Sequence, residues 1–423
     1  MNNARKAAVT ALCDVERSGS YSNLASGYAI STGELSRQDA AFTTMLVYGV
    51  LQRKLTLDAI ISKYINGSFK KIHPFVLSVL RTGIYQLLFM DRVPMFAAVN
   101  ESVLLIRNSK QRFAVGFANA VLRKVAAEKD ELLQFIDSSD DPAVRYSCPG
   151  EVYDCLVKDH GKARADAFLA ESLKSPKTYF RVNNAVTDMD TLLSDLKNSG
   201  IEITPCKPYG AFYADNAGEL LSSEQFEKGC FFVQDKASQL AVSALGITDG
   251  MDILDVCAAP GGKSFSAAQY LSAHGSVVSC DIYEKRVGLI ASGAKRLCLD
   301  CIKTRVADAA VFDPSLPQFD RVICDVPCSG LGVIRRKPEI KYRNISEYDD
   351  LPKLQLKILE TSAGYLKKGG RIMYSTCTVF DRENRQVVSE FLKGGRFKVI
   401  TEKLLMPQTD GSDGFYFCIM ERD

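Results

Sequence analysis

Hydrophobic residues in the first third of the chain recur every three or four positions, which is the spacing of one helix face. After Pro74, placed where a proline commonly begins a helix, this spacing joins Val76, Leu77, Leu80, Ile84, Leu87 and Leu88. Pro94 separates this stretch from a second helical one. Few strand-like alternations interrupt the region, so residues 1–140 are predicted to form an all-helical bundle.

The pattern becomes mixed after the polar segment that ends at Pro142. Helical stretches are expected near residues 163–173 and 189–199, and strand-like stretches at 178–183 and 230–233. Residues 141–245 are therefore predicted to form a small α+β module that links the bundle to the rest of the chain.

From residue 246 onward, strand-like and helical stretches alternate. Strands are expected at Ile253–Cys257, Ser276–Cys280, Thr304–Val306, Arg321–Asp325 and Arg371–Ser375, with two more at Phe397–Ile400 and Phe415–Met420. Helical stretches between the first five predict an open, mostly parallel sheet with helices on both faces, a Rossmann-like α/β domain over residues 246–423. The chain is thus predicted to be multidomain, in keeping with its 423 residues.

Polar and reactive residues gather where these strands end. Ligands of such sheets bind beyond the carboxyl ends of the strands. At or just past a predicted strand end lie Asp255–Lys263, Asp281, Asp308, Asp325 and Cys377. We therefore expect one edge of the sheet to carry the functional site.

Composition limits the class of protein. Apolar residues make up 46% of the chain, enough for ordinary cores, and no apolar run reaches the ~18 residues of a membrane span. Residues 1–19 mix charged with apolar positions, which predicts an amphipathic helix and not a signal peptide. Thirteen cysteines without framework spacing are expected to be reduced thiols, so we expect a cytoplasmic protein.

Charge is distributed unevenly, although the net charge is only +3. Residues 1–140 hold 17 Lys and Arg against 12 Asp and Glu, and two basic clusters stand out at 107–124 and 335–343. Either cluster alone is equally consistent with a solvated face, but the two together favour a polyanionic substrate. The candidate contacts to it are Arg107, Arg112, Arg335 and Arg336.

The segment Cys257-Ala-Ala-Pro-Gly-Gly-Lys-Ser264, after the first strand of this sheet, has the form of a cofactor loop. A dehydrogenase fingerprint requires G-x-G-x-x-G, which the segment lacks. Gly262-Lys263-Ser264 fits the end of a phosphate-binding P-loop, and residues 321–325 resemble its Walker-B strand, but Cys257 takes the place of the first glycine. A P-loop-like NTPase is thus an alternative interpretation.

S-adenosylmethionine suits the same loop better. This ligand needs a turn of small residues that lets the backbone approach it, and the loop provides Cys257, Ala258, Ala259, Pro260, Gly261, Gly262 and Lys263. Asp281 stands where a carboxylate accepts from the ribose hydroxyls, and Asp308 where one accepts from the adenine amino group. Capping of the following helices is the other interpretation of each carboxylate, and the loop beside them favours the cofactor.

Two further motifs complete a resemblance to a known family. Asp325-Val-Pro-Cys-Ser-Gly330 and Ser375-Thr-Cys377 resemble the catalytic motifs of the Nop/Sun family of RNA cytosine-5 methyltransferases, and residues 255–263 resemble its cofactor motif. Residues 233–239 and 332–341 also read as family motifs. The resemblance is to the bacterial Sun/Fmu (RsmB-like) branch that methylates 16S ribosomal RNA, and residues 1–140 resemble its NusB-type RNA-binding bundle.

This resemblance implies an enzyme that uses S-adenosylmethionine to methylate carbon 5 of a cytosine in 16S ribosomal RNA. By resemblance, Cys377 is the nucleophile and Cys328 assists release of the product. Asp325 is expected to hold the base beside the cofactor, supported electrostatically by Lys263. The four arginines then become candidate RNA contacts. Buried packing at a strand end is the alternative interpretation of both cysteines.

The remaining expectations concern partners. The three histidines have no ligand spacing, and the pair Cys298 and Cys301 has no second pair, so no metal site is expected. We expect a monomer that acts on free or partly assembled small-subunit RNA, away from any membrane. The competing class of function is a non-catalytic NusB-type RNA-binding adaptor, which requires neither a cofactor loop nor motif cysteines.

Overall fold

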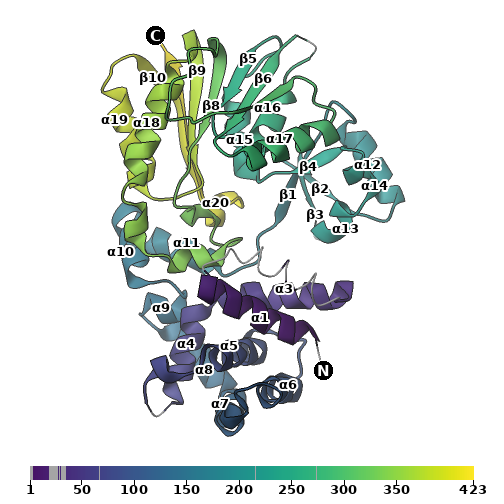
Figure 1. Cartoon of the computed structure of the whole chain (residues 1–423), viewed down its shortest axis with the longest axis vertical. Coiled ribbons are helices and arrows are strands. Elements are labelled where there is room, and N and C mark those ends of the chain that lie inside the picture. The colour runs from purple at the N-terminus through teal and green to yellow at the C-terminus, as the bar shows by residue number, and fades with distance from the viewer. Residues whose placement is uncertain are drawn as a thin grey trace. The chain divides into compact units, whose positions relative to one another are not determined.

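The computed structural model describes residues 3–18, 27, 29, 35–65, 67–214, 216–272 and 274–423. Internal contacts divide the chain into two compact units, which we describe in turn (Figure 1). The first comprises Met1–Lys174 with Ile334–Asn344, and the second comprises Ser175–Val333 with Ile345–Asp423.

Helices build the first unit. They are α1 (Asn3–Ser18), α3 (Arg37–Gln52), α4 (Lys54–Lys63), α5 (Pro74–Phe89), α6 (Met95–Arg107), α7 (Val115–Ala127), α8 (Lys129–Ser138), α9 (Pro142–Arg145), α10 (Gly150–His160) and α11 (Lys162–Ser172). The predicted helical bundle is confirmed, with Pro74 as the first residue of α5 and Pro94 just before α6. The expected helix over residues 1–19 is α1, and its two predicted ends lie outside the described residues.

A segment from far along the sequence completes the first unit. Residues 334–344 belong to it and include the short turn η4 (Pro338–Tyr342). The buried ammonium of Lys341 donates to the backbone carbonyls of Gln52 and Tyr146 at 3.0 and 3.4 Å. Burial lowers the pKa of Lys341 to about 8.

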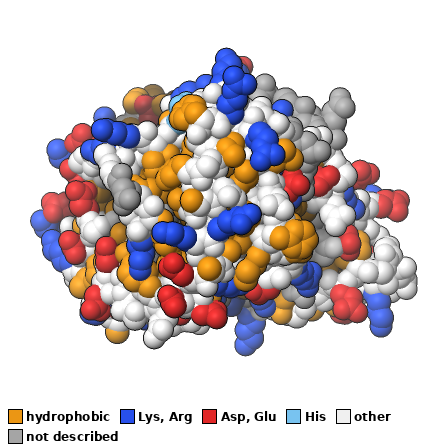
Figure 2. Space-filling model, turned by 90° about the horizontal axis from the view of Figure 1, so that it is seen from below, with side chains coloured by type: hydrophobic (Ala, Val, Ile, Leu, Met, Phe, Trp, Pro, Cys, Tyr) orange, Lys and Arg blue, Asp and Glu red, His pale blue; other side chains and the backbone are white. Residues whose placement is uncertain are grey.

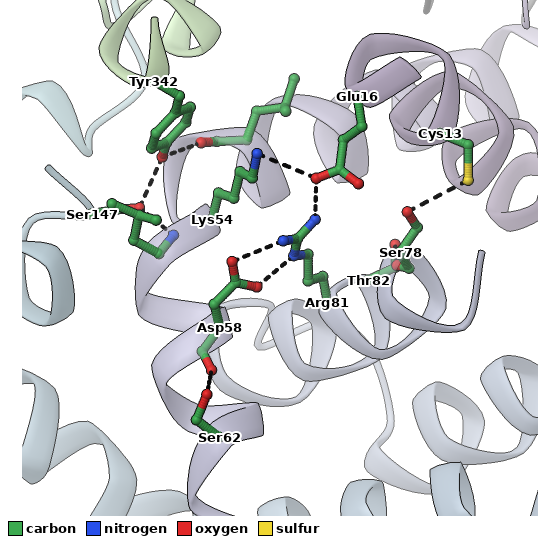
Figure 3. Close-up of polar contacts among 12 residues, drawn as sticks. Cys13, Glu16, Lys54, Asp58, Ser62, Ser78, Arg81, Thr82, Ser147 and Tyr342 are labelled. Carbon is green, nitrogen blue, oxygen red and sulfur yellow. Dashed lines mark hydrogen bonds and ion pairs between the residues drawn. The ribbon is translucent and has the colours of Figure 1, made fainter. Parts of the chain in front are cut away.

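An ion cluster lies beside this segment within the first unit (Figure 3). Arg81 of α5 donates to both carboxylate oxygens of Asp58, at 2.6 and 2.8 Å, and also pairs with Glu16. Lys54 pairs with Glu16 at 3.2 Å, and its ammonium lies 5.3 Å from the centre of the Tyr342 ring. Since every charge has an opposite partner, the cluster joins α1, α4 and α5 without an isolated buried ion.

The boundaries of the compact units differ from the predicted ones. Residues 141–174 belong to the helical unit and not to the α+β module, and residues 334–344 belong there too. The polar segment read as a domain break is a helix cap, because the Asp141 carboxylate accepts from the Ala143 amide at 2.8 Å and Pro142 opens α9.

The second unit contains a small antiparallel sheet of order β2-β3-β1-β4. Its strands are β1 (Thr178–Val182), β2 (Thr204–Cys206), β3 (Ala211–Ala214) and β4 (Phe231–Val233), accompanied by the helices α12 (Met189–Asn198), α13 (Ala217–Leu221) and α14 (Glu224–Glu227). Sequence patterns predicted β1, β4 and α12 but missed β2 and β3. Pro205 lies within β2, which tolerates it as an edge strand, and a proline there removes the usual sequence signal for a strand.

The main sheet of the second unit has seven strands in the order β10-β11-β9-β8-β5-β6-β7. They are β5 (Asp252–Asp255), β6 (Ser276–Asp281), β7 (Ile302–Val306), β8 (Phe319–Asp325), β9 (Leu366–Thr376), β10 (Phe397–Leu405) and β11 (Phe415–Arg422). The first five pair in parallel, while β11 runs antiparallel to both β9 and β10. The predicted, mostly parallel Rossmann-like sheet is confirmed.

Helices cover both faces of this sheet (Figure 1). One face packs against α15 (Lys236–Ala244), α16 (Gly262–Ala268) and α17 (Glu284–Arg296), and the other against α18 (Leu351–Ala363) and α19 (Arg385–Leu392). Consecutive strand residues point to opposite faces, so Ile253 belongs to the first apolar core and Leu254 to the second. Strands buried on both faces read as continuous apolar runs, which explains why the sequence identified them.

One predicted helix is absent. Residues 307–318, between β7 and β8, form turns and no helix. Pro314 and Pro317 both lie in this connection, and a proline removes a helical hydrogen bond. The chain crosses here from β7 at one edge of the sheet back to β8 beside β5, so the strand order reverses between β5 and β8. Ligands of such sheets bind at this reversal.

Candidate active site

The predicted cofactor loop connects the carboxyl end of β5 to α16. Gly261 has a φ of 112°, and a Cβ atom there would lie 2.3 Å from the Phe265 ring, so only glycine fits. The Ala258 amide donates to the Cys280 carbonyl at 2.8 Å, which ties the loop to the end of β6. The loop therefore places small side chains at the edge of the sheet where β5 and β6 end.

A cavity of about 200 Å³ lies against this loop. Its lining consists of Gln234, Asp235, Ser238, Asp255, Cys257, Ala258, Ala259, Pro260, Gly262, Lys263 and Asp325. Gln234, Asp235 and Ser238 were not predicted as site residues from the sequence, although they lie in the family-like segment 233–239. The Gln234 amide donates to the Gly262 carbonyl at 2.8 Å and so holds that segment against the loop.

Asp255, the last residue of β5, is fully buried and lines this cavity. One of its oxygens accepts from the Ser264 hydroxyl at 2.7 Å, and Ser279 donates in turn to Ser264 at 2.8 Å. The other oxygen has no hydrogen-bond partner. Burial raises the pKa of Asp255 to about 7, although the bond from Ser264 opposes the rise.

The raised pKa of Asp255 predicts a pH-dependent stability. Its unfolded pKa is ~3.9, so folding favours the protonated carboxyl, and this contribution is lost as the pH rises through about 7. Between pH 6 and 8 the free energy of unfolding should fall by about 1 kcal/mol on this account. The Asp255→Asn variant should lose that fall, as measured by urea unfolding at pH 6, 7 and 8.

The matched control for this measurement is Glu390→Gln. It removes a partly exposed carboxylate of α19 that pairs with Lys393, the residue just after this helix. This variant should keep the wild-type dependence on pH. An equal slope in Asp255→Asn and wild type would show that Asp255 does not titrate in this range.

Asp281 and Asp308 lie at the carboxyl ends of β6 and just past β7, as predicted. The buried Asp281 carboxylate accepts from the Tyr283 amide at 3.2 Å and lies 3.4 Å from Arg286. Asp308 is exposed and accepts from the Ala310 amide at 2.9 Å. Since no helix follows Asp308, helix capping does not explain that residue. The cavity's described lining includes neither carboxylate.

The two motif cysteines meet at the ends of neighbouring parallel strands. Cys328 follows β8 and Cys377 follows β9, and their sulfur atoms lie 3.2 Å apart. Both are free thiols. The hydrogen bond to Cys377, together with burial, raises the pKa of Cys328 well above its usual value. The pairing of β8 with β9 therefore brings together two residues that lie 49 positions apart in the sequence.

A partly buried ion pair lies at the same edge. The Lys263 ammonium contacts the Asp325 carboxylate at 2.6 Å, and the Ser375 hydroxyl donates to the other Asp325 oxygen at 2.7 Å. Burial alone would lower the pKa of Lys263, but the carboxylates of Asp325 and Asp255 outweigh it and hold that pKa above its usual value. The predicted contact between Lys263 and Asp325 is thus present.

The candidate RNA contacts differ in exposure. Arg107 and Arg112 are exposed, and Arg336 is half-buried. Figure 2 views the chain from the end where Figure 1 places α6 and α7, and there Lys and Arg side chains lie among hydrophobic ones. Arg335 does not fit its predicted role as a surface contact, because its side chain is buried and lies 3.7 Å from Glu171.

Two features are absent from the described residues. No helix among them is long and apolar enough to cross a membrane. Within the same residues, no group of three or more His, Cys, Asp or Glu side chains has the arrangement of a metal site.

The fold and the site together define a class of protein. A Rossmann-like sheet with a small-residue loop after its first strand is the fold of S-adenosylmethionine-dependent methyltransferases, and the cavity beside that loop is where such a fold binds its ligand.

Comparison with known proteins identifies the family. The model of 16S rRNA methyltransferase RsmB/F matches residues 242–421, and the NusB family model matches residues 2–127. The chain is 34% identical to the probable ribosomal RNA small subunit methyltransferase B of Bacillus subtilis (strain 168), over 99% of this chain and 98% of that protein. The chain is 32% identical to the ribosomal RNA small subunit methyltransferase B of Pseudomonas putida, over 98% of this chain and 97% of that protein. The chain belongs to the RsmB/Sun family of S-adenosylmethionine-dependent ribosomal RNA methyltransferases.

Solved structures share the fold. PH0851 aligns over 100% of this chain and 99% of its own, with a TM-score of 0.81 and 20% identity. NSun6 from Pyrococcus horikoshii, crystallised with SFG, aligns over 65% of this chain and 98% of its own, with a TM-score of 0.59 and 19% identity. Membership of an enzyme family sets aside both alternatives from the sequence, the P-loop-like NTPase and the non-catalytic adaptor.

Proposed function

We propose that the protein transfers the methyl group of S-adenosylmethionine to carbon 5 of a cytosine in 16S ribosomal RNA, through a covalent bond between Cys377 and carbon 6 of that base. The observation that carries this proposal is the pair of sulfur atoms 3.2 Å apart beside the Lys263–Asp325 ion pair. Two thiols at one sheet edge suit a reaction that adds a nucleophile and later expels it.

The chemistry requires such a pair because carbon 5 of cytosine is a poor nucleophile. The Cys377 thiolate forms a bond to carbon 6, and the displaced electron pair makes carbon 5 nucleophilic. The bound cofactor would supply an electrophilic methyl group: as carbon 5 bonds to the methyl carbon, the methyl–sulfur bond would break and its electron pair would stay on the sulfur of the leaving thioether. Cys328 then assists loss of the carbon-5 proton, the double bond re-forms, and the bond between Cys377 and carbon 6 breaks.

The charges around the two sulfurs support Cys377 as the nucleophile. The Cys377 thiolate is among the negative charges that favour the Lys263 ammonium. Around Cys328, the carboxylates of Glu383 and Asp325 add to the hydrogen bond with Cys377 and to burial in raising its pKa. We infer that the proton between the sulfurs stays on Cys328 and that the thiolate forms on Cys377.

The cofactor suits the cavity beside the loop. The cavity is lined by the small residues Ala258, Ala259 and Gly262 of this loop, and one oxygen of the Asp255 carboxyl that also lines it has no hydrogen-bond partner. We assign the loop from Cys257 to Lys263 to the methionine part, Asp281 to the ribose and Asp308 to the adenine. Asp325 lies between the cofactor loop and Cys328, where it is placed to hold the base.

The RNA partner is proposed to enter as a single strand or with the target base flipped out, because a stacked base cannot reach the sulfurs. The helical unit is proposed to bind the surrounding RNA. Arg107 and Arg112 are exposed there, and Phe113, beside Arg112, is 78% exposed, which offers a stacking surface next to a positive charge. A ribosomal RNA substrate makes the cytoplasm the site of action.

The direct test uses purified protein, methyl-labelled S-adenosylmethionine and small-subunit RNA from a strain that lacks the corresponding gene. Bisulfite sequencing before and after reaction should reveal one newly protected cytosine, on naked RNA or on the partly assembled subunit. Transfer of label without bisulfite protection would overturn the carbon-5 assignment. Absence of transfer to either RNA form would overturn the proposed function.

A further inference from the structure

Glu383 and Asn384 are two consecutive polar residues to which the proposed chemistry assigns no contact with the reacting atoms, yet both are fully buried next to the cysteines. Glu383 ends the short turn η6 (Asp381–Glu383), and Asn384 follows it just before α19. Burying a carboxylate and an amide is costly unless their hydrogen bonds are made, so the partners of these two side chains indicate what they do.

Glu383 holds the loop of Cys328. One of its carboxylate oxygens accepts from the Ser329 amide at 2.9 Å and from the Gln355 side-chain amide at 3.0 Å. The same Gln355 amide also donates to the Pro327 carbonyl at 2.9 Å. The peptide groups on both sides of Cys328 are therefore fixed through the Glu383–Gln355 pair. The second Glu383 oxygen is buried and has no hydrogen-bond partner.

Asn384 holds the loop of Cys377 in the same manner. Its side-chain oxygen accepts from the Thr376 hydroxyl at 2.5 Å, and its side-chain nitrogen donates to the Thr378 carbonyl at 3.1 Å. These are the residues immediately before and after Cys377. A further bond, between the Ser329 and Thr378 hydroxyls at 2.8 Å, joins the two loops directly.

Two neighbours in the sequence thus each fix one cysteine. A single peptide bond connects Glu383 to Asn384, so both cysteine loops are hydrogen-bonded to the same short piece of backbone. A shift of either residue therefore changes the distance between the sulfurs. The Tyr374 hydroxyl donates to the Glu383 carbonyl at 2.6 Å and so holds this piece of backbone against β9.

We propose that Glu383 and Asn384 are positioning residues of the methyl transfer, Glu383 for Cys328 and Asn384 for Cys377, and that together they set the separation of the two sulfurs. The assignment of a step to each residue rests on the proposed function of the two cysteines. The claim about sulfur separation does not, and it is tested on its own.

The separation is measured by oxidative trapping with diamide. The two thiols lose two protons and two electrons to form a disulfide, and the diazene bond of diamide takes them up to become a hydrazine. In the wild-type protein we expect rapid formation of the Cys328–Cys377 disulfide, identified by peptide mass spectrometry. Glu383→Ala and Asn384→Ala should each slow it about tenfold or more, because a misplaced sulfur no longer meets its partner.

Glu383→Gln is the rescuing variant. Its amide oxygen accepts from Ser329 and Gln355 as the carboxylate does, and its NH₂ group takes the place of the oxygen that has no partner. It should therefore trap at the wild-type rate or faster, because loss of the Glu383 charge also lowers the pKa of Cys328, whereas the control Glu390→Gln should trap at the wild-type rate. If the Ala variants do not fold, Gln355→Met removes the donor to Pro327 and should slow trapping. Wild-type trapping rates in folded Glu383→Ala, Asn384→Ala and Gln355→Met would overturn the proposal.

The kinetic readout separates the two residues. Glu383→Ala should accumulate a covalent protein–RNA complex that survives denaturing gels, as expected when release is impaired. Asn384→Ala should form little complex and lose roughly 100-fold in kcat, with KM for the cofactor unchanged. The same pattern in both variants would overturn the division of roles. Should Cys377→Ala keep activity, the proposed function fails, and the trapping rates still decide the positioning role.

Discussion

The Cys377→Ala variant is expected to form neither methylated RNA nor a covalent complex, whereas Cys328→Ala is expected to accumulate a protein–RNA complex that survives denaturation. Removing a catalytic nucleophile typically lowers kcat by a factor on the order of 10³ or more. Both outcomes are measured with methyl-labelled cofactor, followed by denaturing gels that separate free from protein-bound RNA.

The difference follows from the order of the steps. Attack by Cys377 comes first, so nothing proceeds without it. In Cys328→Ala, attack and methyl transfer remain possible, but the carbon-5 proton leaves slowly, and the bond between Cys377 and carbon 6 cannot break until that proton is lost. The complex should therefore vanish in the double variant, because it consists of the Cys377 bond.

The matched control is Cys418→Ala, which removes a fully buried thiol in the middle of β11, away from the carboxyl ends of β8 and β9. It should retain near wild-type transfer and form no stable complex. Accumulation of the complex in Cys377→Ala would mean that the two roles are exchanged. Full activity in both Cys377→Ala and Cys328→Ala would contradict the thiol-addition mechanism.

The sequence predicted the parts of the site that depend on strand ends. β5, β6, β8 and β9 each contain a short apolar stretch close to the carboxyl end, so these ends could be located, and parallel pairing brings them to one edge. Asp255, Lys263, Asp325, Cys328 and Cys377 all lie there. Their distances could not be predicted, because the contact of Cys328 with Cys377 depends on the β8–β9 register and on the loops beyond it.

The sequence could not predict which basic residues are buried. Arg335 and Lys341 lie in a cluster of positive charge that reads as a solvent-exposed stretch, yet the segment 334–344 packs into the helical unit and buries both. Lys341 is retained there by the carbonyls of Gln52 and Tyr146, which lie about 290 and 195 positions away in the sequence. No local sequence pattern can predict hydrogen-bond partners that lie so far apart in the sequence.

Glu383 and Asn384 show the same limit at the site itself. In the sequence they stand in a charged stretch beside Asp381 and Arg382, which is typical of an exposed turn. Their burial becomes evident only when the loops of Cys328 and Cys377 are built, since those loops supply the amides, hydroxyls and carbonyls that the two side chains bind.

The Lys263→Met variant is expected to lose methyl transfer by roughly 100-fold or more near pH 7, because a partly buried cation is removed from beside Asp325 and the motif cysteines. Lys263 contacts Asp325 at 2.6 Å, and its ammonium is also favoured by Asp255 and by the Cys377 thiolate. Removing Lys263 leaves the partly buried Asp325 carboxylate without its cation, so the variant should also unfold more readily in urea.

The pH dependence distinguishes two ways in which Lys263 can act. A nearby cation lowers the pKa of a thiol, so its removal should raise that of Cys377 and reduce the thiolate present at neutral pH. If the main role of Lys263 is to support that thiolate, kcat of Lys263→Met should recover as the pH rises toward 9, and alkylation of Cys377 by iodoacetamide should show the same shift. If Lys263 acts mainly by orienting Asp325, neither rate should recover with pH.

Lys367→Met provides the matched control, because Lys367 forms a comparable pair with Asp320 at 2.9 Å. This pair lies near the amino-terminal ends of β9 and β8, whereas the cysteines follow the carboxyl ends of these strands. This pair is more exposed than the pair of Lys263 with Asp325, and its loss should change stability little. It should leave kcat and the alkylation of Cys377 unchanged. A fall in kcat of equal size in both variants would show that the loss in Lys263→Met reflects general weakening of the sheet. A fall confined to Lys263→Met, accompanied by the alkaline shift in Cys377 alkylation, would assign to Lys263 the task of holding the nucleophile ionised.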